Sequence, residues 1–221
     1  QRRECHKVYK IMKKVFITGT GTGVGKTYIT SIILKNLLLR QKVIGIKPIS
    51  AGISLDNLLN EDVQTLLDCQ PSIDDHQKIN FYSLKKAVSP HIGAEEEGMQ
   101  IDFDFIKQRI SALENEYDRV LIEGVGGILS PVDQSRTNLD LIKHLDIPVI
   151  LIIGLKLGCI NDALLTQHAL QSSDIKIFGW IGNQIDPEME EVDKNIEYLK
   201  KNITSSCLEV NKYGSDNLYL N

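Results

Sequence analysis

Short apolar runs alternate along the chain with longer stretches in which apolar positions recur every three or four residues. The runs are rich in valine and isoleucine and predict strands, whereas the longer stretches predict helices. The predicted strands are Val15–Thr18, Val43–Lys47, Arg119–Ile122, Val149–Ile153 and Ile177–Gly182. The predicted helices are Lys26–Arg40, Asn57–Asp68, Asp102–Glu116, Asn138–His144, Cys159–Gln171 and Glu188–Asn202. In the third of these the apolar stripe comprises Phe105, Ile106, Ile110 and Leu113.

Strands that are apolar throughout and separated by helices predict a sheet buried on both faces. Such a pattern is typical of a doubly wound α/β fold, a mostly parallel sheet with helices on both faces. Ligands of such folds bind at the carboxyl ends of the strands. No repeat, low-complexity block or linker divides the sequence, so we expect one domain over residues 12–221. Residues 1–11 form a polar, basic stretch before Met12 and are expected to be an extension outside the fold.

Composition excludes several classes of protein. The 221 residues include 25 Lys plus Arg and 29 Asp plus Glu, which gives a net charge of -4. Non-specific electrostatic binding to nucleic acid or to an anionic membrane is therefore not expected. Apolar runs such as Val149–Ile153 are too short to cross a bilayer. The four cysteines (Cys5, Cys69, Cys159 and Cys207) are scattered without a C-x-x-C pair. This pattern excludes a disulfide framework or zinc site as the organising principle and favours a reducing, cytoplasmic setting.

The segment Gly19–Thr27, with the sequence GTGTGVGKT, carries the strongest chemical signal. It lies between a predicted strand and a predicted helix, where glycines let backbone N–H groups point at phosphate oxygens. Lys26 can reach the β- and γ-phosphates of a nucleotide, and the Thr27 hydroxyl can bind Mg²⁺. The alternative is a glycine-rich turn that only joins strand to helix, and the Gly-Lys-Thr ending favours the nucleotide site. The predicted fold is thus that of the P-loop nucleotide hydrolases.

Further polar residues follow the ends of predicted strands. Glu123 comes directly after one strand and can be a Mg²⁺ ligand or a solvated acid. Asp62 lies on a predicted helix, and its residue pattern alone favours solvent over nucleotide. Lys47 precedes Pro48 and can neutralise a transferred phosphoryl group or simply end its strand at the surface. Asn161 and its neighbours begin a predicted helix, where they can cap it or receive a carboxylate.

Two other chemically reactive residues are not expected to belong to the site. His91 follows Ser89 and Pro90 and is expected to be a loop residue. Cys159 has no His or Asp beside it in the sequence and is not expected to be a nucleophile.

Several ordered motifs together resemble the dethiobiotin synthetase family from Met12 to about Asn183. The motifs are Thr18-Gly19-Thr20-x-Thr22-x-Val24-Gly25-Lys26-Thr27, Gly45-x-Lys47-Pro48, Ser89-Pro90-His91, Glu123-Gly124-x-Gly126-Gly127, Lys156-Leu157-Gly158-Cys159-Ile160-Asn161 and Gly179-Trp180-x-x-Asn183. The resemblance covers roughly three-quarters of the chain and is more specific than a phosphate-binding loop alone.

The resemblance implies an ATP-dependent cyclo-ligase that acts with Mg²⁺. Enzymes of this family make the cyclic urea of dethiobiotin from 7,8-diaminopelargonic acid and CO2, through a carbamate and a carbamic–phosphoric anhydride, and release ADP and phosphate. By the same resemblance we expect a homodimer. Lys47 and Lys26 are the implied catalytic residues, and the implied metal ligands are Thr27, Asp62 and Glu123. The residues implied to bind ATP are Gly23, Val24, Gly25, Lys26, Thr27, Tyr28, Asp62, Glu123, Gly124, Val125, Gly126, Asn183 and Gln184. Those implied to bind the diamine are Thr22, Ser50, Ala51, Gly126, Gly158, Cys159, Ile160 and Asn161.

The sequence departs from the family pattern at a few positions. Gly23 replaces an acid found in many relatives, Ala51 a hydroxyl residue and Gln184 a common aspartate. The main alternative is a P-loop nucleotide switch that positions partners rather than making a product. Switches of that branch carry a second lysine six residues before Thr27, where this chain has Gly21.

Overall fold

A computed structural model describes residues 13–53 and 59–214 of the chain. The strands are β1 (Lys14–Gly19), β2 (Val43–Ile46), β3 (Ile49–Ala51), β4 (Tyr82–Leu84), β5 (Arg119–Glu123), β6 (Val149–Leu155), β7 (Ile177–Gln184) and β8 (Cys207–Asn211). The helices are α2 (Lys26–Leu38), α3 (Glu61–Asp68), α4 (Pro90–Glu96), α5 (Phe103–Glu116), α6 (Asn138–Leu145), α7 (Cys159–Ser172), α8 (Val192–Asn202) and the short 3-10 helix η1 (His76–Lys78).

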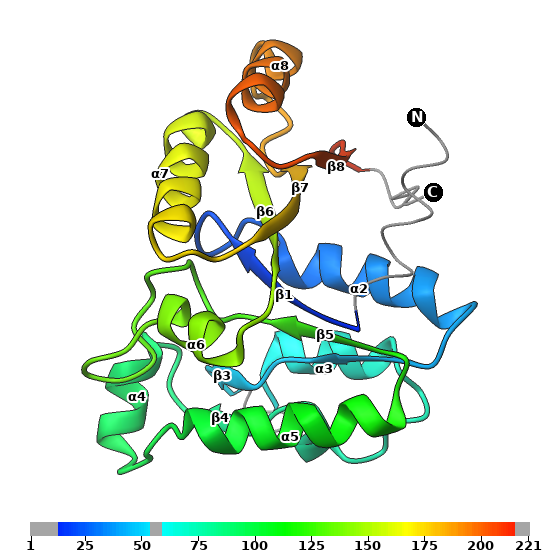
Figure 1. Ribbon diagram of the computed structural model, residues 1–221, viewed down its shortest axis with the longest axis vertical. Coiled ribbons are helices and arrows are strands. Elements are labelled where there is room, and N and C mark those ends of the chain that lie inside the picture. The colour runs from blue at the N-terminus through cyan, green and yellow to red at the C-terminus, as the bar shows by residue number, and fades with distance from the viewer. Residues whose placement is uncertain (1–12, 54–58, 215–221) are drawn as a thin grey trace.

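Six of the described strands form one sheet in the order β2-β5-β1-β6-β7-β8, and every neighbouring pair is parallel. Helices cover both faces of this sheet (Figure 1), so the predicted doubly wound fold is confirmed. Helix α2 packs against α3 on one side, whereas α5 packs against α6 and α7 against α8. Strands β3 and β4 form a separate parallel pair.

The chain order reverses at β1, whose neighbours in the sheet are β5 and β6. In an open parallel sheet, the loops that leave such a point diverge and open a crevice at the carboxyl ends of the strands. The loop after β1 and the loop after β5 both leave from this edge, so the topology brings residues 20–25 beside residues 124–127.

The core confirms that the strands are buried on both faces. Every residue of β2, β5 and β6 is buried, as continuous apolar runs predict for a covered parallel sheet. A smaller cluster around Trp180 and Leu151 lies under α7 and α8. Among the described helices, none is both long and apolar enough to span a membrane.

Several boundaries and elements differ from the sequence prediction. The helix predicted over Glu188–Asn202 begins only at Val192, because Glu191 has a left-handed backbone with φ 52°. The helix predicted over Asn57–Asp68 begins at Glu61 within the described part, and the predicted extension at residues 1–11 lies outside the described residues. Strands β3, β4 and β8 and helix α4 were not predicted, since each spans seven residues or fewer and carries little periodic signal.

Two predictions about single side chains are wrong. Phe105, placed in the apolar stripe of α5, is 38% exposed and lies edge-on to Phe81 and Tyr82. Phe103 takes the buried position instead, in register with the other buried residues of that helix. His91, predicted to be a loop residue, lies on α4, where Pro90 occupies the first turn.

Candidate active site

The loop between β1 and α2 has the shape of a phosphate cradle. Gly23 and Gly25 have positive φ angles of 73° and 84°, which L side chains rarely adopt. A Cβ at Gly25 would also lie 2.2 Å from Nδ2 of Asn183. Glycine is therefore required at this position twice over, by backbone angle and by the close approach of a neighbouring strand.

Lys26 folds back over this loop at the start of α2. Its side chain is nearly buried, and Nζ donates a hydrogen bond to the Gly21 carbonyl at 2.8 Å. Burial and the nearby positive charge of Lys47 lower the pKa of Lys26 to about 8, and the attraction of Glu123 and Asp62 offsets this only in part. The Lys26 ammonium group therefore lies against the backbone of the loop, and its lowered pKa means that it loses its proton more readily than an exposed lysine does.

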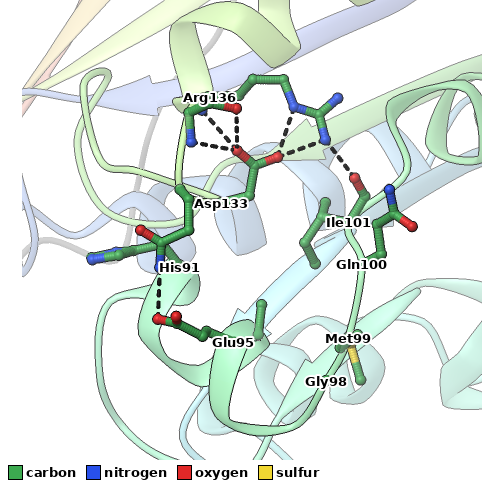
Figure 2. Close-up of a pocket in the computed structure, with 11 residues that line it drawn as sticks. His91, Glu95, Gly98, Met99, Gln100, Ile101, Asp133 and Arg136 are labelled. Atoms are coloured by element: carbon green, nitrogen blue, oxygen red, sulfur yellow. Dashed lines mark hydrogen bonds and ion pairs between the residues drawn. The ribbon is translucent and has the colours of Figure 1, made fainter.

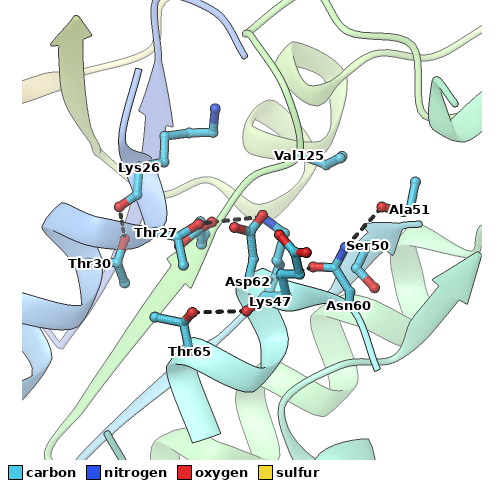
Figure 3. A network of polar contacts seen from close by, with 12 residues as sticks. Lys26, Thr27, Thr30, Lys47, Ser50, Ala51, Asn60, Asp62, Thr65 and Val125 are labelled. Atoms are coloured by element: carbon cyan, nitrogen blue, oxygen red, sulfur yellow. Dashed lines mark hydrogen bonds and ion pairs between the residues drawn. The ribbon is translucent and has the colours of Figure 1, made fainter. Parts of the chain in front are cut away.

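A compact polar network joins α2, β2, α3 and β5 beside this loop (Figure 3). Lys47 Nζ lies 2.7 Å from Oε1 of Glu123 and 2.7 Å from Oδ2 of Asp62. The Thr27 hydroxyl donates to the same Glu123 oxygen at 2.6 Å. One point at the carboxyl edge of the sheet therefore brings together residues from α2, α3, the end of β5 and the position directly after β2.

Charge pairing governs protonation in this network. Burial alone would lower the pKa of Lys47, but the charges of Glu123 and Asp62 and the hydrogen bonds to them outweigh it and raise that pKa. Burial would raise the pKa of Asp62, yet the Lys47 charge, aided by hydrogen bonds from Lys47 and Thr27, lowers it. Lys47 is therefore cationic and Asp62 anionic at neutral pH.

The oxygen atoms of this network suit a hard divalent cation. The Glu123 side chain is fully buried, and its Oε2 has no hydrogen-bond partner among the described residues. A buried carboxylate oxygen normally has a donor or a cation as partner. Asp62, with its side chain 44% exposed, and the Thr27 hydroxyl supply two further oxygens. This donor set, all oxygen with two carboxylates, is the one that Mg²⁺ prefers.

The glycine-rich loop after β5 packs directly against the loop after β1. A Cβ at Gly127 would lie 3.4 Å from Cα of Gly21, and a Cβ at Gly126 would lie 3.7 Å from the Thr22 hydroxyl. Gly124 lies so close to the Phe16 ring that a Cβ would approach it to 2.6 Å. The two loops expected to hold nucleotide and diamine therefore form one surface.

Asn138 holds this second loop in place, and sequence reasoning did not single it out. Its buried Nδ2 donates to the Val125 carbonyl and to the Gly127 carbonyl, the latter at 2.9 Å. The available signal was the capping box of Thr137 and Asp140, which places Asn138 in the first turn of α6.

Strand β3 ends at Ala51, and its last two residues together with Gly52, named the 50–52 turn below, lie on the other side of Lys47. The Ser50 hydroxyl is buried and donates to Oδ1 of Asn80, whose Nδ2 donates to the Lys47 carbonyl at 2.7 Å. The carbonyls of Ala51 and Gly52 both accept from Asn60. Neither asparagine was predicted, since nothing in their local sequence distinguishes them from turn or cap residues.

Asn183 is placed differently from its expected role at the base of the nucleotide. Its side chain is buried, donates to the Val24 carbonyl at 3.0 Å and accepts from Asn211. Gln184 is half-buried and donates to the Asp186 carbonyl. The structure therefore shows Asn183 bracing the phosphate loop, and its contact with a base stays a prediction.

The start of α7 is a separate group among the predicted substrate residues. Gly158 has φ 93° and caps the helix, and Asn161 is exposed. The Cys159 N–H, expected to receive a carboxylate, donates instead to the Lys156 carbonyl at 3.0 Å. The Cys159 side chain is buried, whereas Ile160 is half-buried. The hydrogen bonds of this segment in the structure are local to it.

The remaining predicted residues lie on the rim of the first loop. Thr22 and Gly23 are exposed, Val24 is buried, and Tyr28 is 37% exposed on α2. Thr22, Gly23 and Val24 thus belong to the loop itself. Tyr28 lies in the first turn of α2, directly after Thr27.

A hollow of about 580 Å³ lies away from this network, between α4 and the turn at residues 133–136 (Figure 2). Arg136 forms an ion pair with Asp133 at 2.6 Å, donates to the Ile101 carbonyl and stacks 3.9 Å from the Phe103 ring centroid. His91 lines the same hollow. The arginine therefore ties the turn to the start of α5 as a structural brace.

Comparison with known proteins identifies relatives over nearly the whole chain. A family model described as an AAA domain matches residues 13–209. The ATP-dependent dethiobiotin synthetase BioD of Nitrosospira multiformis is 37% identical over 202 residues, covering 91% of this chain and 88% of that protein. The protein of the same name from Legionella pneumophila is 38% identical, covering 92% and 95%.

Solved structures show the same fold at lower identity. The MinD cell division protein of Aquifex aeolicus superposes with a TM-score of 0.54 at 19% identity, covering 90% of this chain and 81% of that one. The signal recognition particle receptor FtsY of Elizabethkingia anophelis gives 0.52 at 15% identity, covering 95% and 64%. At this identity the likeness concerns the fold alone.

Proposed function

The chain belongs to the dethiobiotin synthetase family and is an ATP-dependent enzyme that forms carbon–nitrogen bonds, and on that premise we propose how its residues divide the reaction. Its substrates are ATP, a diamine of the diaminopelargonic acid type and CO2. The network of Lys47, Glu123, Asp62 and Thr27 beside the phosphate loop is the observation that carries the assignment of roles.

The reaction needs three bond-forming steps. One amine of 7,8-diaminopelargonic acid attacks CO2 and loses a proton to give a carbamate. A carbamate oxygen then attacks the γ-phosphorus of ATP, the bond to ADP breaks, and a carbamic–phosphoric anhydride results. Finally the second amine attacks the carbonyl carbon, phosphate leaves, and a proton is lost as the cyclic urea closes.

The second step brings an anionic carbamate against an anionic phosphate, so positive charge must be held at their meeting point. We assign that role to Lys26 and Lys47. Lys47 is buried and held by two carboxylates, which keeps it protonated and fixes its direction. A charge that is already oriented requires no rearrangement when the transition state forms.

Mg²⁺ would be held by Thr27, Asp62 and Glu123. When bound, it would neutralise the β- and γ-phosphate charges of ATP. Lys47 bridges the two carboxylates in the structure, and these same carboxylates would hold the metal.

The diamine is proposed to lie between the two glycine-rich loops and the 50–52 turn. Thr22, Ser50, Ala51 and Gly126 would face it there. The start of α7, at Gly158–Asn161, would receive the carboxylate of a diamine bound to a partner subunit, which requires a homodimer. Asn183 and Gln184 are proposed to lie beside adenine, and ATP use is consistent with a cytoplasmic enzyme.

Phosphate release tests the proposed function directly. We expect phosphate from ATP only when diaminopelargonic acid and bicarbonate are supplied together, with one phosphate per dethiobiotin formed. A P-loop switch would instead hydrolyse ATP slowly without either substrate. ATP hydrolysis that does not change on adding the two substrates would contradict the assignment. Mass spectrometry of the product would show whether hydrolysis is coupled to dethiobiotin formation or is only stimulated by the substrates.

A further inference from the structure

Asn60 stands between the two halves of the candidate site and contacts both. It precedes α3 and accepts a hydrogen bond from the Asp62 N–H at 3.1 Å, which caps the helix. Its Nδ2 donates to the Ala51 carbonyl at 2.9 Å (Figure 3). The same Nδ2 donates to the Gly52 carbonyl at 2.9 Å. One planar amide thus uses its acceptor on the helix and both donors on the turn.

The two segments that it joins carry different parts of the site. Asp62, two residues into the helix, forms the ion pair with Lys47, whereas the 50–52 turn is proposed to face the diamine. The other side of the turn is already anchored: the Gly52 N–H donates to the Leu84 carbonyl, and a Cβ at Gly52 would lie 2.9 Å from Cβ of Ala87. The Ala51 and Gly52 carbonyls accept from Asn60, which adds a second point of attachment to the one made by β4.

A helix cap does not require these donors. Serine, threonine and aspartate cap helices about as well as asparagine through an oxygen acceptor alone. The described helices α5 and η1 are capped by Asp102 and Asp75 in that way. An oxygen acceptor alone would therefore be enough for the cap of α3, whereas the amide nitrogen of Asn60 also donates to two carbonyls.

We propose that Asn60 is a positioning residue that holds the diamine-facing turn in register with the Asp62–Lys47 pair. The inference rests on the proposed function, because it takes the 50–52 turn to be part of the diamine site. Substrate geometry at this point matters because the carbamate must meet the γ-phosphate within bonding reach.

The principal test is Asn60→Ser, which retains a capping oxygen and removes both amide N–H donors. We expect the KM for diaminopelargonic acid to rise about tenfold from the loss of two hydrogen bonds, while the KM for ATP changes less than about twofold. The melting temperature should stay near that of the parent, because the cap remains. Asn60→Asp, with an oxygen facing two carbonyls, should raise the KM for the diamine at least as much.

Asp102→Ser is the matched control, since it exchanges a cap residue remote from the site and should leave both KM values unchanged. Equal increases in the two KM values, or no increase with the fold intact, would overturn the inference. Ala51→Leu separates it from its premise, because added bulk on the turn should itself raise the KM for the diamine. If Ala51→Leu has no effect, the turn is not in the diamine site and the inference falls with it, whereas an effect there without one at Asn60 refutes the positioning role alone.

Discussion

Lys47 combines burial with two ionic partners, and this combination makes it sensitive to substitution. The side chains of Lys47 and Glu123 are 4% and 0% exposed, so water reaches neither charge and each depends on the other as its ionic partner. Removing one member of a buried ion pair leaves the other charge uncompensated, which costs about 3–5 kcal/mol of unfolding free energy. Lys47 therefore supports the fold as well as the chemistry proposed for it.

For Lys47→Met we expect turnover to fall about 100- to 1,000-fold, as for the loss of other oriented charges at a transition state. A non-hydrolysable ATP analogue should still bind, because the phosphate loop and Lys26 remain. Calorimetric titration and steady-state kinetics measure the two effects. Lys78→Met, which removes an exposed ion pair with Glu116, is the control and should alter neither. Near-normal turnover by Lys47→Met would remove this lysine from the mechanism.

Lys26 predicts a pH dependence of nucleotide affinity. Its pKa in the free protein is lowered to about 8 by burial and by Lys47, so its positive charge is lost as pH rises through that value. A bound phosphate favours the charged form, so affinity must fall above pH 8, by up to about tenfold per pH unit. Lys47 keeps its charge over this range because its pKa is raised.

Calorimetric titration of a non-hydrolysable ATP analogue between pH 7.5 and 9.5 measures this dependence, above the range in which the phosphates themselves titrate. Lys26→Arg cannot lose its charge in this range and provides the comparison, with a flat profile expected over the same range. A flat profile in the parent protein would show that Lys26 has an ordinary pKa.

The phosphate loop depends on a strand far from it in the sequence. Asn183 on β7 donates to the Val24 carbonyl, 159 residues away along the chain, and lies over Gly25. The glycines of the loop could be recognised from its spacing, and so could the helix that follows it. The clamp could not, because asparagine at the end of a strand carries no local pattern.

Gly25→Ala should therefore abolish nucleotide binding in a way that Gly21→Ala does not. The new Cβ at residue 25 meets Asn183 and a positive φ, and such backbone strain costs about 1–3 kcal/mol of unfolding free energy. A Cβ at Gly21 would meet nothing within 4 Å. Thermal unfolding with and without nucleotide measures both variants. Equal behaviour of the two would show that the clamp is dispensable.

At the level of the assembly, the start of α7 is expected to serve the site of a partner subunit. Asn161→Glu places a second carboxylate at the helix start and should weaken diamine binding far more than ATP binding. Lys47→Met disables the other half of the site. Random mixing and reassembly of the two variants should then restore up to about one quarter of the parent activity, because half of the dimers are mixed and each has one intact site.

Sedimentation of the parent protein provides the check on that design, since the restored activity requires a dimer. Recovery of no activity from stable mixed dimers would place the α7 start in the site of its own subunit. Parent-like activity of Asn161→Glu alone would place the α7 start outside the site.

Local pattern was sufficient for the long elements and for the phosphate loop. Valine- and isoleucine-rich runs and helical periodicity are properties of neighbouring residues, and so is the Gly-Lys-Thr ending that precedes α2. Three-residue strands such as β3 and β4 were not predicted, because a segment of that length is too short to show a hydrophobic period. Phe105 was misplaced by the same limit, since Phe103 fits the stripe equally well and only packing distinguishes them.

Contacts between distant residues depended on the fold. Lys47 and Glu123 are 76 residues apart, and Thr27 and Glu123 are 96 apart, yet Lys47 and Thr27 both donate to the same Glu123 oxygen. Residue type and position suggested each of them as a candidate, but the residue pattern alone left a surface or solvated role open for Lys47, Glu123 and Asp62. Parallel strands bring their carboxyl ends to one edge of a sheet, and the order β2-β5-β1 places these particular ends side by side. Which lysine pairs with which acid, and which asparagines hold the surrounding loops, follows from that order rather than from any stretch of the chain.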